Sequence, residues 1–245
     1  MLEQMFERLS IETSSYCRRR CATCLRQTYP DRDALKPWFS QNLMPTELVY
    51  NLLDQAAAMG FAGTVCLSYY NEPTFDKRLP EFGEYAMRLG FARVTVATTG
   101  DTLDEDMAKR LDGCFHDLSV SLYENSNEEN KDRIRSLFQK THIRFTNGLH
   151  VHLHLSPTSK YGSFRCFNVS RNMVINHRGD FLACCQEIIP HFDLGSAHDT
   201  PLADLWDAKR HLRERLLRHG GRMEHPYCAM CSYGGVKEYV EVASV

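Results

Sequence analysis

Residues 8–24 read RLSIETSSYCRRRCATC and join a strand pattern directly to three cysteines. The first six residues alternate between apolar and polar side chains, which predicts a short β-strand over residues 8–13. Cys17, Cys21 and Cys24 follow with C-x3-C-x2-C spacing, so they lie on the loop after that strand. Three thiolates at this spacing fit three corners of a four-iron four-sulfur (4Fe–4S) cluster and leave one iron without a protein ligand.

Downstream of this loop, strand and helix patterns alternate up to residue 155. The expected helices cover residues 46–60, 79–90, 102–111 and 125–140. The further expected strands cover residues 63–70, 92–100, 117–123, 142–147 and 149–156. About six strands with helices between most of them predict an α/β fold with a parallel sheet or an incomplete barrel. In such folds the chemistry lies at the carboxyl ends of the strands, where the first cysteines fall.

The pattern changes after Pro157 and predicts a second, smaller unit. NMVIN and FLACC, joined by the turn HRGD, predict a β-hairpin over residues 172–185. A helix rich in Arg and Leu over residues 202–221 then leads to the pair Cys228 and Cys231. We therefore expect one unit over residues 8–155 and a second over residues 156–235.

The composition limits the class of protein. The chain has 245 residues, of which 43% are hydrophobic and 24% charged, and its formal net charge is −2. These values are typical of a globular protein with a substantial core, and they provide no basic field that would attract nucleic acid or anionic lipid. The N-terminal residues do not resemble a secretory signal, and no run approaches the roughly 18 apolar residues of a membrane span. We therefore expect a cytoplasmic protein with no membrane or nucleic-acid partner.

The ten cysteines are unusual in such a chain. Reducing cytoplasm disfavours disulfides, so clustered cysteines are better interpreted as ligands of metal or iron–sulfur. The first set alone could also contribute to a zinc site, and the C-x2-C pair fits zinc as well. Cys66, in a predicted buried strand, and Cys114, near a helix end, are expected to be packing residues.

The segment CRRRCATC, after a first strand and ahead of a β/α alternation, resembles the signature of the radical S-adenosylmethionine (SAM) superfamily. The resemblance implies a partial (β/α)6 TIM-like barrel in which the open iron binds SAM. It also implies reductive cleavage of SAM to a 5′-deoxyadenosyl radical that removes a substrate hydrogen. By the same resemblance, the SAM contacts lie at the ends of the second, third and fourth strands: Tyr70, Asn71, Glu72, Pro73, Thr98, Thr99 and Ser121.

The remaining clustered cysteines resemble the auxiliary-cluster regions of that superfamily called SPASM and, in shortened form, twitch. The resemblance implies one further 4Fe–4S cluster, making two, with the ligands Cys166, Cys184, Cys228 and Cys231. Cys185 is adjacent to one of these ligands and is expected to point away. Four protein ligands leave no open iron, which suits transfer of electrons better than binding of substrate.

Within the twitch group, the length and the segment LGSAHDTPLADLW resemble the dehydrogenases of butirosin biosynthesis, which oxidise a hydroxyl of an aminocyclitol to a ketone. The resemblance implies a small sugar- or aminocyclitol-like substrate and a flavodoxin- or ferredoxin-like electron donor. Lys160 is the candidate base beside the hydroxyl. His150, His152 and His154 share one face of an expected strand and invite a metal site, but a polar barrel interior is the preferred interpretation.

Three alternatives remain open at this point. One is a maturase of a ribosomal peptide, although only a few residues precede the first strand. A second is an epimerase, which would need a hydrogen donor such as Cys185. The third, from a different class, is a zinc-stabilised binding protein without turnover. The run Arg18–Arg20 is compatible with a phosphate or an anionic cluster, but exposed loop charge is the default interpretation.

Overall fold

The structure, a computed structural model, describes residues 5–22, 24–123, 128–147, 155, 159 and 161–233. Its strands are β1 (Arg8–Ile11), β2 (Thr64–Cys66), β3 (Arg93–Thr98), β4 (Asp117–Leu122), β5 (His142–Asn147), β6 (Asn172–Ile175) and β7 (Phe181–Leu182). Its α-helices are α1 (Leu25–Thr28), α2 (Arg32–Leu35), α3 (Thr46–Ala58), α4 (Leu79–Arg88), α5 (Glu105–Leu111), α6 (Glu128–Ser136), α7 (Asn168–Arg171), α8 (Leu202–Ala208), α9 (Arg210–Leu216) and α10 (Pro226–Met230). Two 3-10 turns are η1 (Pro73–Phe75) and η3 (Gly221–Glu224).

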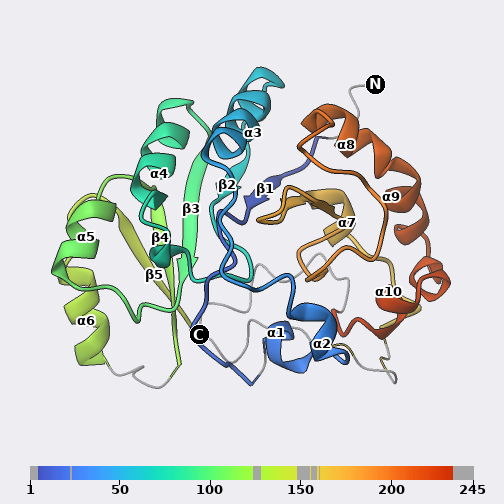
Figure 1. Cartoon of the computed structure of the whole chain (residues 1–245), viewed down its shortest axis with the longest axis horizontal. Coiled ribbons are helices and arrows are strands. Elements are labelled where there is room, and N and C mark those ends of the chain that lie inside the picture. Colours follow the sequence, from blue (N-terminus) through green and yellow to red (C-terminus); the bar gives the residue numbers. More distant parts are fainter. Residues whose placement is uncertain are drawn as a thin grey trace.

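The strands of the described residues form one sheet in the order β5-β4-β3-β2-β1-β6-β7. Neighbours from β5 to β6 are parallel, and only β6 and β7 are antiparallel. Helices α4, α5 and α6 lie outside strands β3 to β5, and the C-terminal helices lie at the other end of the molecule (Figure 1). The parallel order brings the carboxyl ends of β1, β2, β3 and β4 to one edge of the sheet, as the alternating pattern predicted. The expected α/β fold class is confirmed.

The C-terminal hairpin is less separate than the sequence suggested. Strand β6 pairs in parallel with β1 over all four residues, so the hairpin extends the main sheet instead of forming a sheet of its own. All four residues of β6 are buried, which is typical of a strand covered on both faces. Its turn is held by Asn176, whose side-chain oxygen accepts from the backbone N–H groups of Arg178 and Asp180. Gly179 has φ +83°, which the turn requires. The division at residue 155 stays a prediction.

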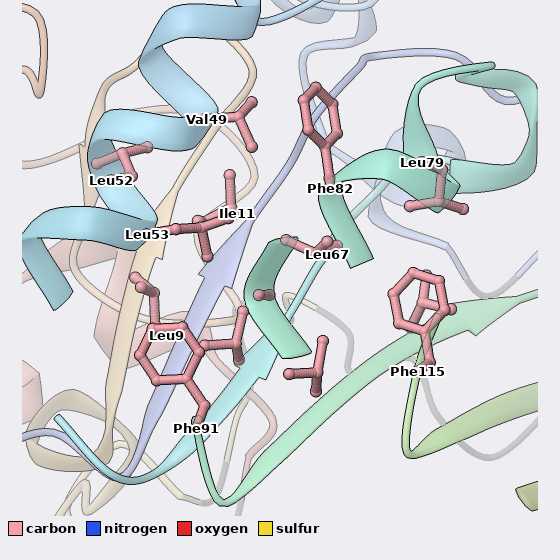
Figure 2. Packing of buried hydrophobic residues seen from close by; sticks show 14 of the residues in the cluster. Leu9, Ile11, Val49, Leu52, Leu53, Leu67, Leu79, Phe82, Phe91 and Phe115 are labelled. Carbon is pink, nitrogen blue, oxygen red and sulfur yellow. The ribbon is translucent and has the colours of Figure 1, made fainter. Parts of the chain in front are cut away.

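The main core lies between the sheet and the helices that follow β1 and β2. Helix α3 directs Val49, Leu52 and Leu53 toward Leu9 and Ile11 of β1 (Figure 2). These five side chains are completely buried. Burying such a side chain contributes about 1.5–3 kcal/mol, so the central strand that carries the first cysteine loop is firmly held in place.

Several boundaries differ from the sequence predictions for local reasons. Helix α5 begins at Glu105 and not near residue 102, because Asp104 caps it by accepting from the Met107 N–H at 2.8 Å. The helix expected over residues 202–221 is divided into α8 and α9 at Lys209. The strand expected over residues 149–156 lies, except for Leu155, outside the described residues. Among the helices of the described residues, none is long and apolar enough to cross a bilayer.

Candidate functional site

The first cysteine loop leaves the carboxyl end of β1 in an ordered path. The backbone N–H of Glu72 donates to the carbonyl of Tyr16 at 2.6 Å, which ties the loop after β2 to the residue before Cys17. Arg26 strengthens the same junction, because its Nη1 donates to the carbonyls of Ser15 at 3.1 Å and Tyr70 at 3.0 Å. No motif in the sequence indicated this role of Arg26. The loops after β1 and β2 are therefore held together beside the cysteines.

The three cysteines of this loop lie close enough for their charges to interact. Burial raises the pKa of Cys17, and it raises that of Cys24 to about 11. A desolvated thiol is costly to ionise alone, whereas a bound iron stabilises the thiolate directly. Partly buried thiols on one loop are therefore suited to ligate iron, and this donor set fits the cluster that the sequence predicted.

Glu72 joins the segments expected to contact SAM. Its Oε1 accepts from the hydroxyls of Thr74 and Thr98, each at 2.6 Å, and its Oε2 accepts from the Thr99 N–H at 2.7 Å. The side chain is only 2% exposed. All of these bonds are to a carboxylate, which makes them stronger than bonds between neutral groups. The carboxylate of Glu72 is therefore occupied in fixing the ends of β2 and β3.

The other expected SAM contacts divide into two groups. Asn71 lies in the same loop and connects it to the first cysteine segment, because its Nδ2 donates to Ser14 Oγ at 3.3 Å. Pro73 begins η1 and is buried. Ser121 lies apart from the Glu72 network, at the end of β4, where its hydroxyl is 3.0 Å from that of Thr146 on β5. Thr146 is a polar neighbour that sequence reasoning did not identify.

The second cysteine set converges on one cavity. Cys166, Cys184, Cys228 and Cys231 all line one cavity, although they come from four positions along 66 residues of chain. Cys184 lines it and its neighbour Cys185 does not, as expected. The cavity lies between the hairpin and the C-terminal helices, where α10 (Pro226–Met230) carries Cys228. The structure therefore brings together all four residues that the sequence grouped.

The walls of this cavity exclude water and include one buried cation, Arg222. Burial raises the pKa of Cys184 and Cys231, and it raises that of Cys228 to about 12. Arg222 is 1% exposed and donates to the carbonyls of Cys231 at 2.8 Å, Tyr233 at 2.7 Å and Cys228 at 3.3 Å. Among the described residues no carboxylate pairs with Arg222, and a buried guanidinium of this kind favours an anionic group nearby. Four thiolates bound to a 4Fe–4S cluster are such a group, so the residues present fit it.

Two tyrosines connect the two cysteine sets. Tyr69 and Tyr70 follow β2, and their ring centroids are 4.5 Å apart. The hydroxyl of Tyr69 donates to the carbonyls of Glu187 at 2.7 Å and Cys184 at 3.2 Å, which lie in the auxiliary segment. Tyr70 interacts electrostatically with both Cys24 and Cys184. The loop after β2 thus lies between the two predicted clusters.

A buried hydrogen-bonded pair fixes the other side of the same loop. Glu12, directly after β1, accepts from His177 Nδ1 at 2.7 Å and from the Tyr70 N–H at 3.1 Å. Both Glu12 and His177 are at most 3% exposed. They link β1, the loop after β2 and the turn of the hairpin. The alternation in RLSIET did place Glu12 next to the strand end, but its partner is 165 residues away along the chain.

Two further charged side chains near the cavity were not foreseen. Glu187 lines the cavity and is 1% exposed. Its carboxylate accepts from the Phe192 N–H at 3.2 Å and from the N–H groups of Ala183 and His191. Burial raises the pKa of Glu187 to about 7. Lys209 is fully buried behind the cavity. A signal for Lys209 existed in the sequence: it lies three residues after Trp206 and seven after Leu202, on the apolar stripe of the predicted helix.

The remaining residues singled out from the sequence fall into two groups. Cys66 and Cys114 are buried packing residues, as expected. Lys160 and the trio His150, His152 and His154 lie outside the described residues. Within the part of the chain that the structure describes, no three His, Cys, Asp or Glu side chains are arranged to hold a single metal ion. The cysteine assignments therefore rest on the shared cavity, burial and mutual interactions given above.

Two family models match this chain, and together they cover most of it. The model of the radical SAM superfamily matches residues 11–148, and that of the SPASM iron–sulfur cluster-binding domain matches residues 166–232. The S-adenosyl-L-methionine-dependent 2-deoxy-scyllo-inosamine dehydrogenase of Niallia circulans is 22% identical over 94% of both chains. A crystal structure of BtrN in complex with AdoMet and 2-DOIA superposes with a TM-score of 0.74, at 20% identity and 94% coverage of both chains. The anSMEcpe structure with bound AdoMet and Cp18Cys peptide gives a TM-score of 0.57 at 13% identity, covering 92% of this chain and 87% of that one.

Proposed function

The chain belongs to the radical SAM superfamily, and on that premise we propose that it oxidises a hydroxyl of a small sugar- or aminocyclitol-like metabolite to a ketone. SAM and 4Fe–4S clusters, expected from the sequence, are the cofactors of the two matched domains. Membership of this superfamily explains the clustered cysteines as iron–sulfur ligands, in place of the zinc-stabilised binding protein.

The observation that carries the proposal is the cavity lined by four cysteines. A cluster held by Cys166, Cys184, Cys228 and Cys231 has all its irons ligated by protein, so it is suited to accept an electron and not to chelate a substrate. Oxidation of an alcohol needs such an acceptor, because the carbinol carbon loses one hydrogen atom and the remaining radical loses one proton and one electron. The named activity of the Niallia circulans relative, a dehydrogenase, supports the same reaction class.

When bound, the cofactors supply a 5′-deoxyadenosyl radical that takes the hydrogen atom and an acceptor for the electron. The chain's own residues position these groups. Cys17, Cys21 and Cys24 would hold the first cluster, and Glu72 fixes the loops proposed to contact SAM against each other. Tyr69 joins the same loop to the auxiliary segment at the carbonyls of Glu187 and Cys184, so the spacing between the two cysteine sets is fixed by direct hydrogen bonds.

The proposed substrate lies between the two cysteine sets, beside the loop that carries Tyr69 and Tyr70. Packing of α1 and α2 against the auxiliary segment encloses this region, because Leu25 and Leu35 form one apolar cluster with Ile188 and Ile189. Exclusion of water protects a substrate radical from side reactions. Lys160 remains the proposed proton acceptor for the hydroxyl.

We also propose that an acidic flavodoxin- or ferredoxin-like protein delivers the electron that starts the reaction. A wide hollow beside the first cysteine loop is lined by Cys17 together with Arg18, Arg20, Arg32 and Lys36. Positive charge beside a cluster ligand favours an acidic protein partner. Neutralising Arg18, Arg20 and Arg32 together should slow turnover driven by flavodoxin at least several-fold and leave turnover driven by dithionite unchanged. Equal effects on both reductants would contradict this docking surface.

The test of the reaction uses reconstituted, anaerobic protein with SAM and dithionite. The probes are 2-deoxy-scyllo-inosamine and related amino- and deoxyinositols that carry deuterium on their carbinol carbons. We expect deuterium in 5′-deoxyadenosine and a ketone product. A Cys166, Cys184, Cys228 and Cys231 to Ala variant should still cleave SAM but form no ketone.

A maturase acting on a peptide is the second candidate, supported by the fold shared with the peptide-bound anSMEcpe structure. It predicts deuterium transfer from a labelled peptide and none from any cyclitol. An epimerase instead predicts solvent hydrogen in a product of unchanged oxidation level, and loss of that product in Cys185→Ala. Either result would overturn the proposed oxidation.

A further inference from the structure

Lys209 occupies an unusual position for a lysine. Its side chain is fully buried at the junction of α8 and α9. Its Nζ donates to the carbonyl of Asn172 at 2.7 Å and lies 4.7 Å from the ring centroid of Trp206 and 5.1 Å from that of Phe181. Within the described chain, no carboxylate lies within ion-pair distance of it. The ammonium therefore has one carbonyl and two aromatic faces as its immediate surroundings.

Such a position is costly for a cation. Taking an ammonium out of water carries a penalty of several kcal/mol unless an opposite charge is close. Burial and the nearby cation Arg213 lower the pKa of Lys209 to about 7, while three groups, the thiolates of Cys184 and Cys166 and the carboxylate of Glu187, act in the opposite direction. Two of these three groups are predicted ligands of the auxiliary cluster. The opposite charge that makes the site favourable thus lies on the side of the cysteine cavity.

The balance of buried charge around the cavity supports the same conclusion. Arg222, Lys209 and its neighbour Arg213 are buried cations, and Glu187 is the buried carboxylate among the cavity's lining residues. A 4Fe–4S cluster with four thiolate ligands is an anion and gains one further negative charge when it is reduced. A fixed positive charge in a medium of low dielectric constant stabilises the reduced form more than the oxidised form.

We propose that Lys209 is the buried counter-charge of the auxiliary cluster and raises its reduction potential. Lys209 is a positioning residue, because it acts on the substrate only through the cluster. A higher potential makes the cluster a better acceptor of the one electron that the substrate radical must lose. The inference rests on the proposed function for the presence of that cluster, but its test needs no substrate.

The experiment uses the full-length chain with Cys17, Cys21 and Cys24 changed to Ala, so that the auxiliary cluster alone is loaded. Its midpoint potential is measured by anaerobic redox titration followed by electron paramagnetic resonance. The variants Lys209→Met and Lys209→Arg are compared with this parent. Lys109→Met, on the exposed face of α5, serves as the matched control because it removes one lysine charge far from the cavity.

We expect Lys209→Met to shift the midpoint potential to more negative values, and Lys209→Arg and Lys109→Met to leave it at the parent value. An unchanged potential in Lys209→Met, or an equal shift in Lys209→Arg, would overturn the inference. If Lys209→Met loads no iron, loading of about four irons by Lys209→Arg would support a role of the charge. Failure of both to load iron would show that packing matters and not charge.

The outcome is separable from that of the proposed function. A negative shift in Lys209→Met together with no ketone from any cyclitol would support the role of Lys209 and contradict the dehydrogenase. Absence of iron from the parent variant would overturn both.

Discussion

Glu72→Gln tests how the SAM-contacting loops are held. The amide keeps one oxygen for the hydroxyls of Thr74 and Thr98, but places an NH2 group where Oε2 accepts the Thr99 N–H at 2.7 Å. The substitution therefore leaves one buried donor without an acceptor. That loss costs about 1–3 kcal/mol. For a chain of this size it lowers the melting temperature by about 2–12 °C, since each kcal/mol shifts it by roughly 2–4 °C.

The same substitution should weaken SAM binding. If about 1–2 kcal/mol of the penalty falls on the loop conformation that contacts SAM, the affinity decreases by about 5- to 30-fold. Calorimetry of reconstituted protein under anaerobic conditions measures the melting temperature, and SAM titration measures the affinity. Glu81→Gln, an exposed change on α4, is the matched control. A Glu72→Gln protein that melts with the wild type and binds SAM equally would refute the role given to this carboxylate.

Three further predictions follow from the cavity, the tyrosine connection and the sheet. Arg222→Met removes the donors to the carbonyls of Cys228 and Cys231, so bound iron should decrease from about eight to about four atoms per chain. Retention of about eight irons would show that these hydrogen bonds do not hold the second cluster site. Tyr69→Phe loses two hydrogen bonds to the auxiliary segment, worth about 1–2 kcal/mol together, and calorimetry should show a melting temperature lower by about 2–8 °C; an unchanged value would remove this connection. Burial disfavours the charged form of Asp117, but hydrogen bonds from Arg93, Thr95 and Arg144 outweigh burial and hold its pKa below the usual value. The contribution of the Asp117 carboxylate to stability is therefore present at neutral pH and is lost as the pH falls through that lowered pKa. The melting temperatures of the apoprotein and of Asp117→Asn should converge at acidic pH, and a constant difference between them would contradict this.

Local patterns were sufficient to predict most strands, the first cysteine set and the pair Cys228 and Cys231. Strand β1 and the cysteines after it are adjacent along the chain, and Cys228 and Cys231 are separated by one turn of α10. Grouping Cys166 with them needed the resemblance, because no local rule joins residues so far apart. The structure supplied the independent observation that all four line one cavity.

The missed features are long-range. Strand β6 lies beside β1 because the second edge of β1 is available for pairing, and sequence patterns do not assign edges. The pair Glu12 and His177 depends on that alignment of β1 and β6. Lys209 was not singled out from the sequence, although its spacing from Trp206 places it on the apolar stripe of the predicted helix. A charged residue on such a stripe indicates a buried partner, and the structure shows the carbonyl of Asn172 in that place.

The measurement that tests the account most directly is iron counting combined with a SAM-cleavage assay after anaerobic reconstitution. We predict about eight irons in the wild type and about four in each of two variants, one with Cys17, Cys21 and Cys24 and the other with Cys166, Cys184, Cys228 and Cys231 changed to Ala. Deoxyadenosine should form in the wild type and not in the first variant. Zinc in place of iron, or iron-loaded wild type that forms no deoxyadenosine under strong reductant, would contradict the account.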